Sequence, residues 1–509
     1  MSFIYDPDDP DEELPLTQFI TPIPTAELTE SLRLDWPIIA EHVLDIFDKY
    51  PATECRVTCI ALFKMGVSED YDTNPSTVYV SVHDGSEESE WPAPVGEVEA
   101  YLGRYNHKLR LHLEHDTSDE SCSDEFPLVR LPLAESDIEE KIGNGFSVNR
   151  TYDTQVGLGA DIGPQRYLSI DGSQDPNKTR YPGLGTLGCW IELKTRREPR
   201  WTKYALTSYH VIRPIFDGFQ ISSNSKGATI PVAPVKGSDC WKVDLHGMSP
   251  STTFTSTPVG IEHPTRTKHN FTVQILERQM GMKKYANKVL QIQTHLSEIN
   301  SFLDNEQHHL GALWAASGFT RRTKNNGRLD WALIKPTSDE RVGTNKLPTG
   351  REWQAARLLS IEPDTDEFLK QPPAWGLRSI GNSELIYKVG TSTGPTAGMY
   401  NEAKAKVHLP DDAHVQPYMG FKYRSHFSDE FLYTGLPIPA RDKWLAKSGD
   451  SGSVVFDKDG AAVGLVFRGP HVAQKASSSW AYVTPIEDIF ADIKAFSKGG
   501  ITDIRIAEE

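Results

Sequence analysis

Apolar residues in the first quarter of the chain follow two different periods. Between Pro37 and Tyr50 they recur every three to four residues, which is the spacing of an amphipathic helix. Alternation of apolar and polar residues then predicts three strands, at residues 56–63, 77–83 and 108–114. A second helix is expected at residues 95–102, between the last two strands. We therefore expect a small α+β domain at residues 17–135, preceded by a disordered acidic tail at residues 1–16.

The remainder of the chain, residues 136–509, has a different pattern. From about residue 150, short apolar stretches alternate with glycine- and proline-rich turns, which is typical of an all-β barrel or sandwich. One segment departs from it, because the apolar residues between Met282 and Leu303 are spaced alternately three and four apart. This spacing predicts a helical insertion at about 265–305. The row of apolar residues between Met282 and Leu303, the seam of this helix, packs against the barrel of the same chain or contacts a partner protein or a second copy of the chain.

The composition of the 509 residues narrows the class of protein. A net charge of −17 argues against nucleic acid or an anionic membrane surface as a partner, since both attract surplus lysine and arginine. The sequence contains no run of ~18 apolar residues, so we expect no membrane-spanning helix. The N-terminus lacks the basic and apolar stretches of a secretion signal. Five cysteines, an odd and sparse set, favour free thiols in a reducing compartment. We therefore expect an intracellular, cytoplasmic protein.

The sequence predicts neither a metal site nor a cofactor. Cys55 and Cys59 have the spacing of half a metal site, but no second Cys or His pair of suitable spacing lies near them. We interpret both as strand residues. The adjacent histidines His308 and His309 are interpreted as a solvated pair that follows the predicted helix.

The first chemical motif is Gly449-Asp450-Ser451-Gly452, which precedes an apolar strand. A serine hydroxyl is a poor nucleophile until a neighbouring base removes its proton. Glycine at position 449 permits the backbone angles of a tight turn, in which the N–H groups of Gly449 and Ser451 can point at one spot and bind an oxyanion. Taken alone, the motif is equally compatible with an ordinary turn.

Two further motifs supply the groups that such a serine needs. His210 directly follows an apolar strand that ends in Thr207-Ser208, so its imidazole lies at a strand end and can act as a general base. Asp330 opens another apolar strand, and a half-buried carboxylate there can orient the imidazole. Taken singly, His210 can be a structural histidine and Asp330 a strand-capping residue.

Together, in the order His210, Asp330, Ser451, these motifs resemble those of the chymotrypsin-like serine peptidases. The motif at residues 449–452 is identical to the serine motif of that family. The segments that end at His210 and begin at Asp330 are similar to its histidine and aspartate motifs.

Two later stretches, residues 387–398 and 463–496, resemble the opening and the end of the second barrel of that family. The resemblance covers about residues 150–498, and neither the N-terminal domain nor the helical insertion belongs to it. It implies a mainly β fold, a chymotrypsin-like double β-barrel with the catalytic groups in the cleft between two six-stranded barrels.

The resemblance also implies an activity, hydrolysis of peptide bonds by a serine endopeptidase without a cofactor. Ser451 attacks the scissile carbonyl, His210 acts as general base and then as general acid, and Asp330 orients His210. The amides of Gly449 and Ser451 form the oxyanion hole. The implied partner is a protein or peptide substrate.

The side of the cleft that recognises the substrate is implied by the same resemblance. It consists of Leu445 and the strand segment Phe467, Arg468 and Gly469. Leu445 stands where trypsin-like enzymes carry an acidic residue, so cleavage after lysine or arginine is not expected. Arg468 can favour an acidic side chain of the substrate.

The chain departs from the family in two respects. His210 and Asp330 are 120 positions apart, a longer separation than usual, and the inserted helix accounts for much of it. No Ile-Val-Gly-Gly start is visible, so activation by proteolysis is not expected, and Asp450 needs a different partner or none.

Other functions compete with the endopeptidase. In a catalytically silent scaffold, the peptidase fold would be retained for protein interaction, but a scaffold has no need of all three residues of the triad. An esterase is less compatible with the sequence, because the Gly-Asp-Ser-Gly turn and the order of the triad both differ from those of the α/β-hydrolases.

Overall fold

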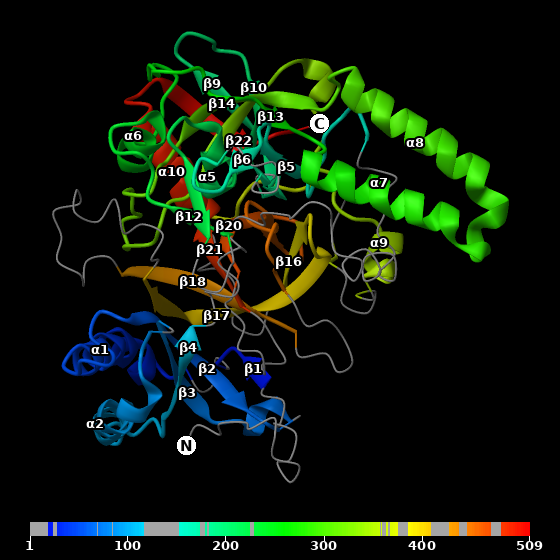
Figure 1. Cartoon of the computed structure of the whole chain (residues 1–509). Helices are drawn as coiled ribbons and strands as arrows, with labels where there is room; N and C mark the ends of the chain where they lie inside the picture. Colours follow the sequence, from blue (N-terminus) through cyan, green and yellow to red (C-terminus); the bar gives the residue numbers. More distant parts are fainter. Residues whose placement is uncertain are drawn as a thin grey trace.

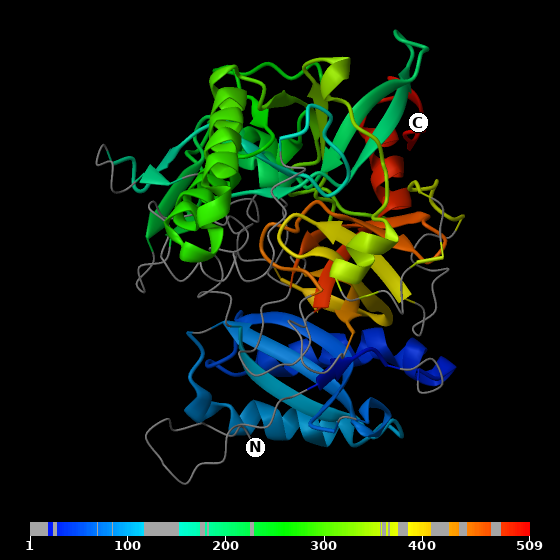
Figure 2. The same cartoon turned by 90° about the vertical axis from the view of Figure 1, so that its right-hand side faces the viewer.

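The computed structural model describes residues 19–116 and 152–508, apart from 24–27, 69, 84, 174–178, 181–182, 224–228, 357, 359–362, 365–366, 375–384, 409–426, 437–444 and 470–479. The predicted disordered tail lies outside these residues. Three parts follow one another along the molecule (Figures 1 and 2): the N-terminal elements at one end, a barrel of late strands in the middle, and a second β sheet with a pair of long helices at the other end.

The middle part is a closed antiparallel barrel of six strands. The strand order is β16-β19-β20-β21-β18-β17, and pairing of β16 with β17 closes the ring. Side chains from all six strands share one apolar core, which includes Ile386, Tyr400 and Val455. The strands are β16 (Leu385–Gly390), β17 (Gly394–Val407), β18 (Ser428–Gly435), β19 (Val454–Asp457), β20 (Ala462–Arg468) and β21 (Trp480–Pro485).

The second sheet has eight strands in the order β22-β9-β10-β15-β14-β13-β5-β8, and it is open within the described part of the chain. Its strands are β5 (Asp161–Pro164), β8 (Gly185–Thr186), β9 (Cys189–Thr195), β10 (Thr202–Thr207), β13 (Ile261–Glu262), β14 (His309–Ala316), β15 (Ala332–Pro336) and β22 (Ile501–Ile506). Two short pairs form separate two-stranded sheets: β6 (Leu168–Ser169) with β7 (Thr179–Arg180), and β11 (Gln220–Ser223) with β12 (Thr229–Val232).

These two sheets confirm the predicted fold class, a mainly β, chymotrypsin-like double β-barrel. The barrel of strands β16 to β21 is closed, whereas the second sheet is a half-barrel, so the expectation of two complete six-stranded barrels is wrong for the second sheet. The physical reason lies at its edge, where β5 and β8 pair over only two residues and the eight-stranded order does not return to β22.

The N-terminal unit, residues 19–116, contains β1 (Phe19–Thr21), α1 (Glu30–Phe47), β2 (Val57–Gly66), β3 (Ser76–His83), α2 (Pro92–Leu102) and β4 (Arg110–Asp116). Strands β2 and β3 are antiparallel, and β4 joins β3 in parallel. Both helices cover one face of this sheet, and the opposite face meets the barrel (Figure 2). Strand β2 also pairs with β17, so the N-terminal sheet continues into the barrel.

Helix α1 begins earlier than its sequence pattern predicts. The apolar spacing suggests a start at Pro37, whereas the helix begins at Glu30, with the Thr29 side chain accepting from the N–H of Leu32 as an N-cap. Pro37 lies inside the helix. A proline removes one helical hydrogen bond and usually marks a first turn, which is why the pattern misplaced the start.

The insertion contains two helices rather than one. Helix α7 (Arg266–Gly281) and helix α8 (Val289–Asp304) lie side by side as a hairpin that projects from the second sheet (Figure 1), and Lys283–Lys288 between them form a 3₁₀ helix. The predicted helix from Met282 is therefore corrected to begin at Val289. Its seam residues Ile292, Leu296 and Ile299 pack against α7, so most of the seam is satisfied within the chain.

The remaining helices are short, except for α10 close to the end of the chain. Within the described residues they are α5 (Tyr209–Ile212), α6 (Asp239–His246), α9 (Gly350–Ala355) and α10 (Ile486–Phe496). Of the helices that the structure describes, none combines the length and the apolar character that crossing a bilayer requires.

Candidate active site

The serine motif forms a tight turn between β18 and β19. The backbone N–H of Asp450 donates to the carbonyl of Lys447, and that of Ser453 donates to the carbonyl of Asp450. Gly449 and Gly452 have φ angles of +92° and +91°, which are costly for residues with a side chain. The turn leaves Ser451 partly exposed, and its Oγ donates to the carbonyl of Phe467 at 3.5 Å.

His210 and Asp330 are brought together by two paired strands. Thr207 at the end of β10 lies opposite Ala332 at the start of β15, so the residues just beyond these strand ends are neighbours. Oδ2 of Asp330 lies 2.6 Å from Nδ1 of His210, and Oδ1 accepts the backbone N–H of His210 at 3.0 Å. The carboxylate therefore holds both the ring and the backbone of the histidine.

Burial shapes the electrostatics of this pair. His210 and Asp330 are only 3% and 2% exposed. Burial by itself raises the pKa of a carboxyl group, but here the charge and the hydrogen bonds of His210 outweigh it and hold the pKa of Asp330 below its ordinary value. The carboxylate is thus ionised at neutral pH, as orienting an imidazole requires.

The serine turn lies against the strand end that carries His210. The N–H of Gly452 and the Oγ of Ser208 both donate to the carbonyl of Val466, at 2.8 and 3.1 Å. A Cβ atom at Gly452 would lie 2.3 Å from Oγ1 of Thr207, so only glycine permits this approach. The structure therefore brings the segments of His210, Asp330 and Ser451, which are far apart in sequence, to one place.

The two amides predicted to bind an oxyanion differ from their neighbours in the turn. Within the described residues, neither the N–H of Gly449 nor that of Ser451 donates a hydrogen bond, whereas those of Asp450 and Gly452 do. Two donors that lack an acceptor among the described residues, on either side of Asp450, suit a group that carries developing negative charge.

The carboxylate of Asp450 is held by five hydrogen bonds in the interior. Oδ1 accepts the N–H groups of Ser392 and Thr393 at 2.9 and 3.2 Å. Oδ2 accepts from Lys388 Nζ at 2.9 Å, from Thr393 Oγ1 at 2.7 Å and from the N–H of Lys447 at 2.9 Å. Asp450 thus has a partner within the chain, the Lys388 ammonium.

This ion pair is completely buried. The side chains of Lys388 and Asp450 are both 0% exposed, and burial lowers the pKa of Lys388 although the charge of Asp450 opposes that effect. Gly390 leaves room for the pair, because a Cβ atom there would lie 2.1 Å from Oδ1 of Asp450. Sequence reasoning missed Lys388; the signal was a lone charged residue in the apolar stretch Leu385–Gly390.

The predicted substrate-binding residues lie side by side, but their side chains point into the protein. Leu445, Phe467 and Arg468 are 1%, 2% and 3% exposed. A Cβ atom at Gly469 would lie 3.6 Å from the carbonyl oxygen of Ala446, so the two segments face each other. The neighbouring residues 437–444 and 470–479 lie outside the described part, and the role of the four residues in substrate binding stays a prediction.

The interpretation of Cys55 and Cys59 as strand residues is confirmed for Cys59, which lies in β2, and wrong for Cys55, which lies in the turn before that strand with a φ angle of +57°. His308 is 5% exposed and stacks on His309 with ring centroids 5.1 Å apart, so the expectation of a solvated pair is wrong for His308. Strand β14 begins at His309 and draws the pair onto the sheet. Among the residues that the structure describes, no group of three or more His, Cys, Asp or Glu side chains could hold a metal ion.

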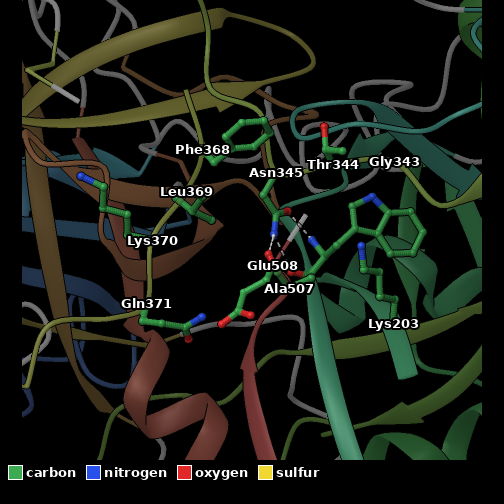
Figure 3. Close-up of a pocket in the computed structure, with 11 residues that line it drawn as sticks. Lys203, Gly343, Thr344, Asn345, Phe368, Leu369, Lys370, Gln371, Ala507 and Glu508 are labelled. Atoms are coloured by element: carbon green, nitrogen blue, oxygen red, sulfur yellow. Dashed lines mark hydrogen bonds between the residues drawn. The ribbon is translucent and has the colours of Figure 1, made fainter. Parts of the chain in front are cut away.

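A cavity of about 450 Å³ lies elsewhere, between β9, the residues that follow β22 and the segments 343–345 and 368–371 (Figure 3). The Asn345 amide spans its wall, donating to the carbonyls of Trp190 and Ala507 and accepting the N–H of Trp190. None of the predicted site residues lines this cavity. The candidate site is therefore identified by its chemistry and not by the volume of a cavity.

Comparison with known proteins yields only distant structural similarity. No protein-family model matches the chain, and no curated protein matches it in sequence. Among solved structures, the chain is similar to the Cellulomonas bogoriensis chymotrypsin, with 11% identity, a TM-score of 0.23 and coverage of 39% of this chain and 76% of that one.

It is also similar to a glutamic acid-specific serine protease that uses a histidine triad in substrate binding, with 11% identity, a TM-score of 0.27 and coverage of 69% and 100%. A third similar structure is Thermobifida fusca protease A, with 9% identity, a TM-score of 0.28 and coverage of 66% and 96%. These values are too low for any property to be transferred. The fold therefore rests on the strand topology of this chain, and the site rests on the geometry of its own residues.

Proposed function

We propose that the protein is a serine endopeptidase with His210, Asp330 and Ser451 as its catalytic triad. The observation that carries the proposal is the buried pair of His210 and Asp330, held by two contacts at 2.6 and 3.0 Å against the turn that presents Ser451. A histidine oriented by a carboxylate is the arrangement that activates a serine hydroxyl.

In the first half of the reaction, Nε2 of His210 removes the proton of Ser451 Oγ as Oγ attacks the carbonyl carbon of the scissile peptide bond. The tetrahedral intermediate then collapses, and His210 gives that proton to the leaving amine. Ser451 remains acylated. Asp330 accepts the hydrogen bond of Nδ1–H and stabilises the transient imidazolium without taking its proton.

In the second half, His210 removes a proton from water, and the hydroxide attacks the acyl carbon. Collapse of this second intermediate returns a proton to Ser451 Oγ and releases the carboxylic acid product. The oxyanion in both halves is assigned to the N–H groups of Gly449 and Ser451. Their lack of an intramolecular acceptor among the described residues supports this assignment.

The substrate is proposed to be a protein or peptide, extended along the strand segment 467–469. The four described cysteines are free thiols, which supports the further proposal of an intracellular, reducing location. Contact with a partner or a second copy through residues 282–303 is also a proposal. Leu290 on α8 is 76% exposed and would belong to such a contact.

Covalent labelling tests the proposed function. A fluorophosphonate probe should modify folded wild-type protein at Ser451, as read by peptide mass spectrometry, and should not modify Ser451→Ala. Ser301→Ala, on the distant helix α8, is the matched control and should label like wild type. A folded wild-type protein that stays unlabelled would support the silent scaffold instead.

A further inference from the structure

The N-terminal unit is joined to the barrel through the backbone. Ile60 and Cys59 of β2 pair with Lys406 and Val407 of β17, and the N–H of His408 donates to the carbonyl of Thr58 at 2.8 Å. The sheet of the barrel therefore continues without a break into the N-terminal unit. This junction holds β2 of the N-terminal unit beside β17 of the barrel.

Aromatic side chains fill the space between the two parts. Phe63 and Tyr79 of the N-terminal strands lie 5.3 and 5.2 Å from Trp480 of β21, measured between ring centroids. Phe467 and Tyr482 belong to the same buried cluster. All five rings are nearly inaccessible to solvent. Close packing of this kind transmits a change of volume to its neighbours.

Polar contacts fix the orientation of these rings. Trp480 Nε1 donates to the hydroxyl of Tyr482 at 3.2 Å, and that hydroxyl donates to Sγ of Cys59 at 3.2 Å. The hydroxyl of Tyr79 donates to Oε1 of Glu114 at 2.6 Å. The N-terminal strands thus hold the ring of Trp480 both by packing and through a chain of hydrogen bonds.

The same cluster reaches the candidate active site through one residue. The carbonyl of Phe467 accepts the hydrogen bond of Ser451 Oγ, while its ring lies in the cluster. The next residue, Arg468, lines a small cavity together with Ser81 and Asp116 of the N-terminal strands. The strand segment beside the nucleophile is therefore shaped from behind by the N-terminal unit.

We propose that the N-terminal unit determines substrate specificity, because the contact of Phe63 and Tyr79 with Trp480 sets the position of the strand segment 467–469, along which the substrate is proposed to bind. The inference rests on the proposed endopeptidase function and adds a role to residues 19–116. Tyr79 is a positioning residue in it, since it lies behind the strand and acts through Trp480 and Phe467. A purely structural N-terminal unit would affect stability alone.

Strand β3 offers a matched pair of variants for the test. Tyr79 faces the barrel, whereas Val80, the next residue, faces α1 and α2 on the other side of the sheet. Tyr79→Leu and Val80→Ala both remove buried volume from the same strand. Only the first alters the surface against Trp480. Phe63→Leu is a milder second change at that surface.

The measurement is a specificity profile, kcat/KM for short fluorogenic peptide amides that vary only in the residue before the scissile bond. Ratios within a profile do not depend on the fraction of folded enzyme. We expect at least one ratio to change fivefold or more in Tyr79→Leu and to change in the same direction in Phe63→Leu. All ratios should stay within twofold of wild type in Val80→Ala.

The outcomes separate the two proposals. Profiles that are unchanged in both Phe63→Leu and Tyr79→Leu, with Ser451 labelled, would overturn this inference and leave the proposed function intact. Equal changes in Val80→Ala would also overturn it, because the effect would then not be specific to the barrel face. A wild-type Ser451 that is not labelled would overturn the proposed function, and the inference would fall with it.

Discussion

Replacing Lys388 by methionine should disable the serine turn although none of the three triad residues is replaced. Methionine has a similar volume and no charge, so the variant leaves the Asp450 carboxylate in the interior without its ammonium partner. Four neutral donors would remain on the carboxylate, from Ser392, Lys447 and both polar groups of Thr393. Removing one member of a buried pair costs about 3–5 kcal/mol of unfolding free energy, because the other charge stays desolvated.

The same change should slow the chemistry. Asp450 lies between Gly449 and Ser451, so any shift of the turn that partly relieves the desolvation of its carboxylate displaces the two amides assigned to the oxyanion. Losing one donor of that kind typically lowers kcat by roughly 10²–10³. We therefore expect fluorophosphonate labelling of Ser451 to slow by about 10²-fold in Lys388→Met, measured at a temperature where the variant is folded.

Two further variants make the test specific. Lys346→Met breaks the largely exposed pair with Glu367 and should cost less than about 1 kcal/mol, with wild-type labelling. The double variant Lys388→Met/Asp450→Asn lacks the unpaired charge, so its free energy of unfolding should be higher than that of Lys388→Met alone. Urea unfolding of the two single variants and the double variant in a double-mutant cycle measures this difference. Labelling of Lys388→Met at the wild-type rate, with a stability loss under about 1 kcal/mol, would refute the reasoning.

Three other outcomes follow from the structure. Asp330→Asn should lower kcat for a peptide amide by roughly 10⁴ with little change in folding, because the wrong tautomer of His210 is then held; a loss below tenfold would contradict the proposed triad. In Gly452→Ala, the fluorophosphonate probe should label Ser451 slowly, and the free energy of unfolding in urea should fall by about 1–3 kcal/mol. The reason is that φ is +91° at this position and the added Cβ would lie 2.3 Å from Oγ1 of Thr207. Labelling and stability equal to those of wild type would contradict the tight turn. Burial lowers the pKa of His308 to about 4, below its ordinary 6.5, so the neutral ring stabilises the fold above pH 6.5 and this stability is lost on acidification. Between pH 6.5 and 5, the free energy of unfolding of His308→Gln should therefore fall by about 1.6 kcal/mol less than that of wild type, and parallel pH profiles of the two proteins would contradict this expectation.

Local patterns were enough for much of the fold. Alternation predicted β2, β3 and β4 to within three residues at each end, because successive side chains of a strand point to opposite faces of the sheet. Helix boundaries were less certain, as α1 shows with Pro37 in its interior. The division of the insertion into α7 and α8 depends on how the two helices pack, which the heptad spacing of one segment does not specify.

Short motifs were sufficient to predict the candidate chemistry, because His210, Asp330 and Ser451 each stand in a segment whose backbone geometry is local. Tertiary structure alone decided which charge faces Asp450, since Lys388 lies 62 positions away and meets it only when β16 pairs beside the serine turn. It also decided that the N-terminal sheet continues into the barrel, where Cys59 lies opposite Val407. Both contacts join residues that are far apart in the sequence, and the free energy of each contact depends on its burial in the folded protein. No local pattern of residues predicts that burial.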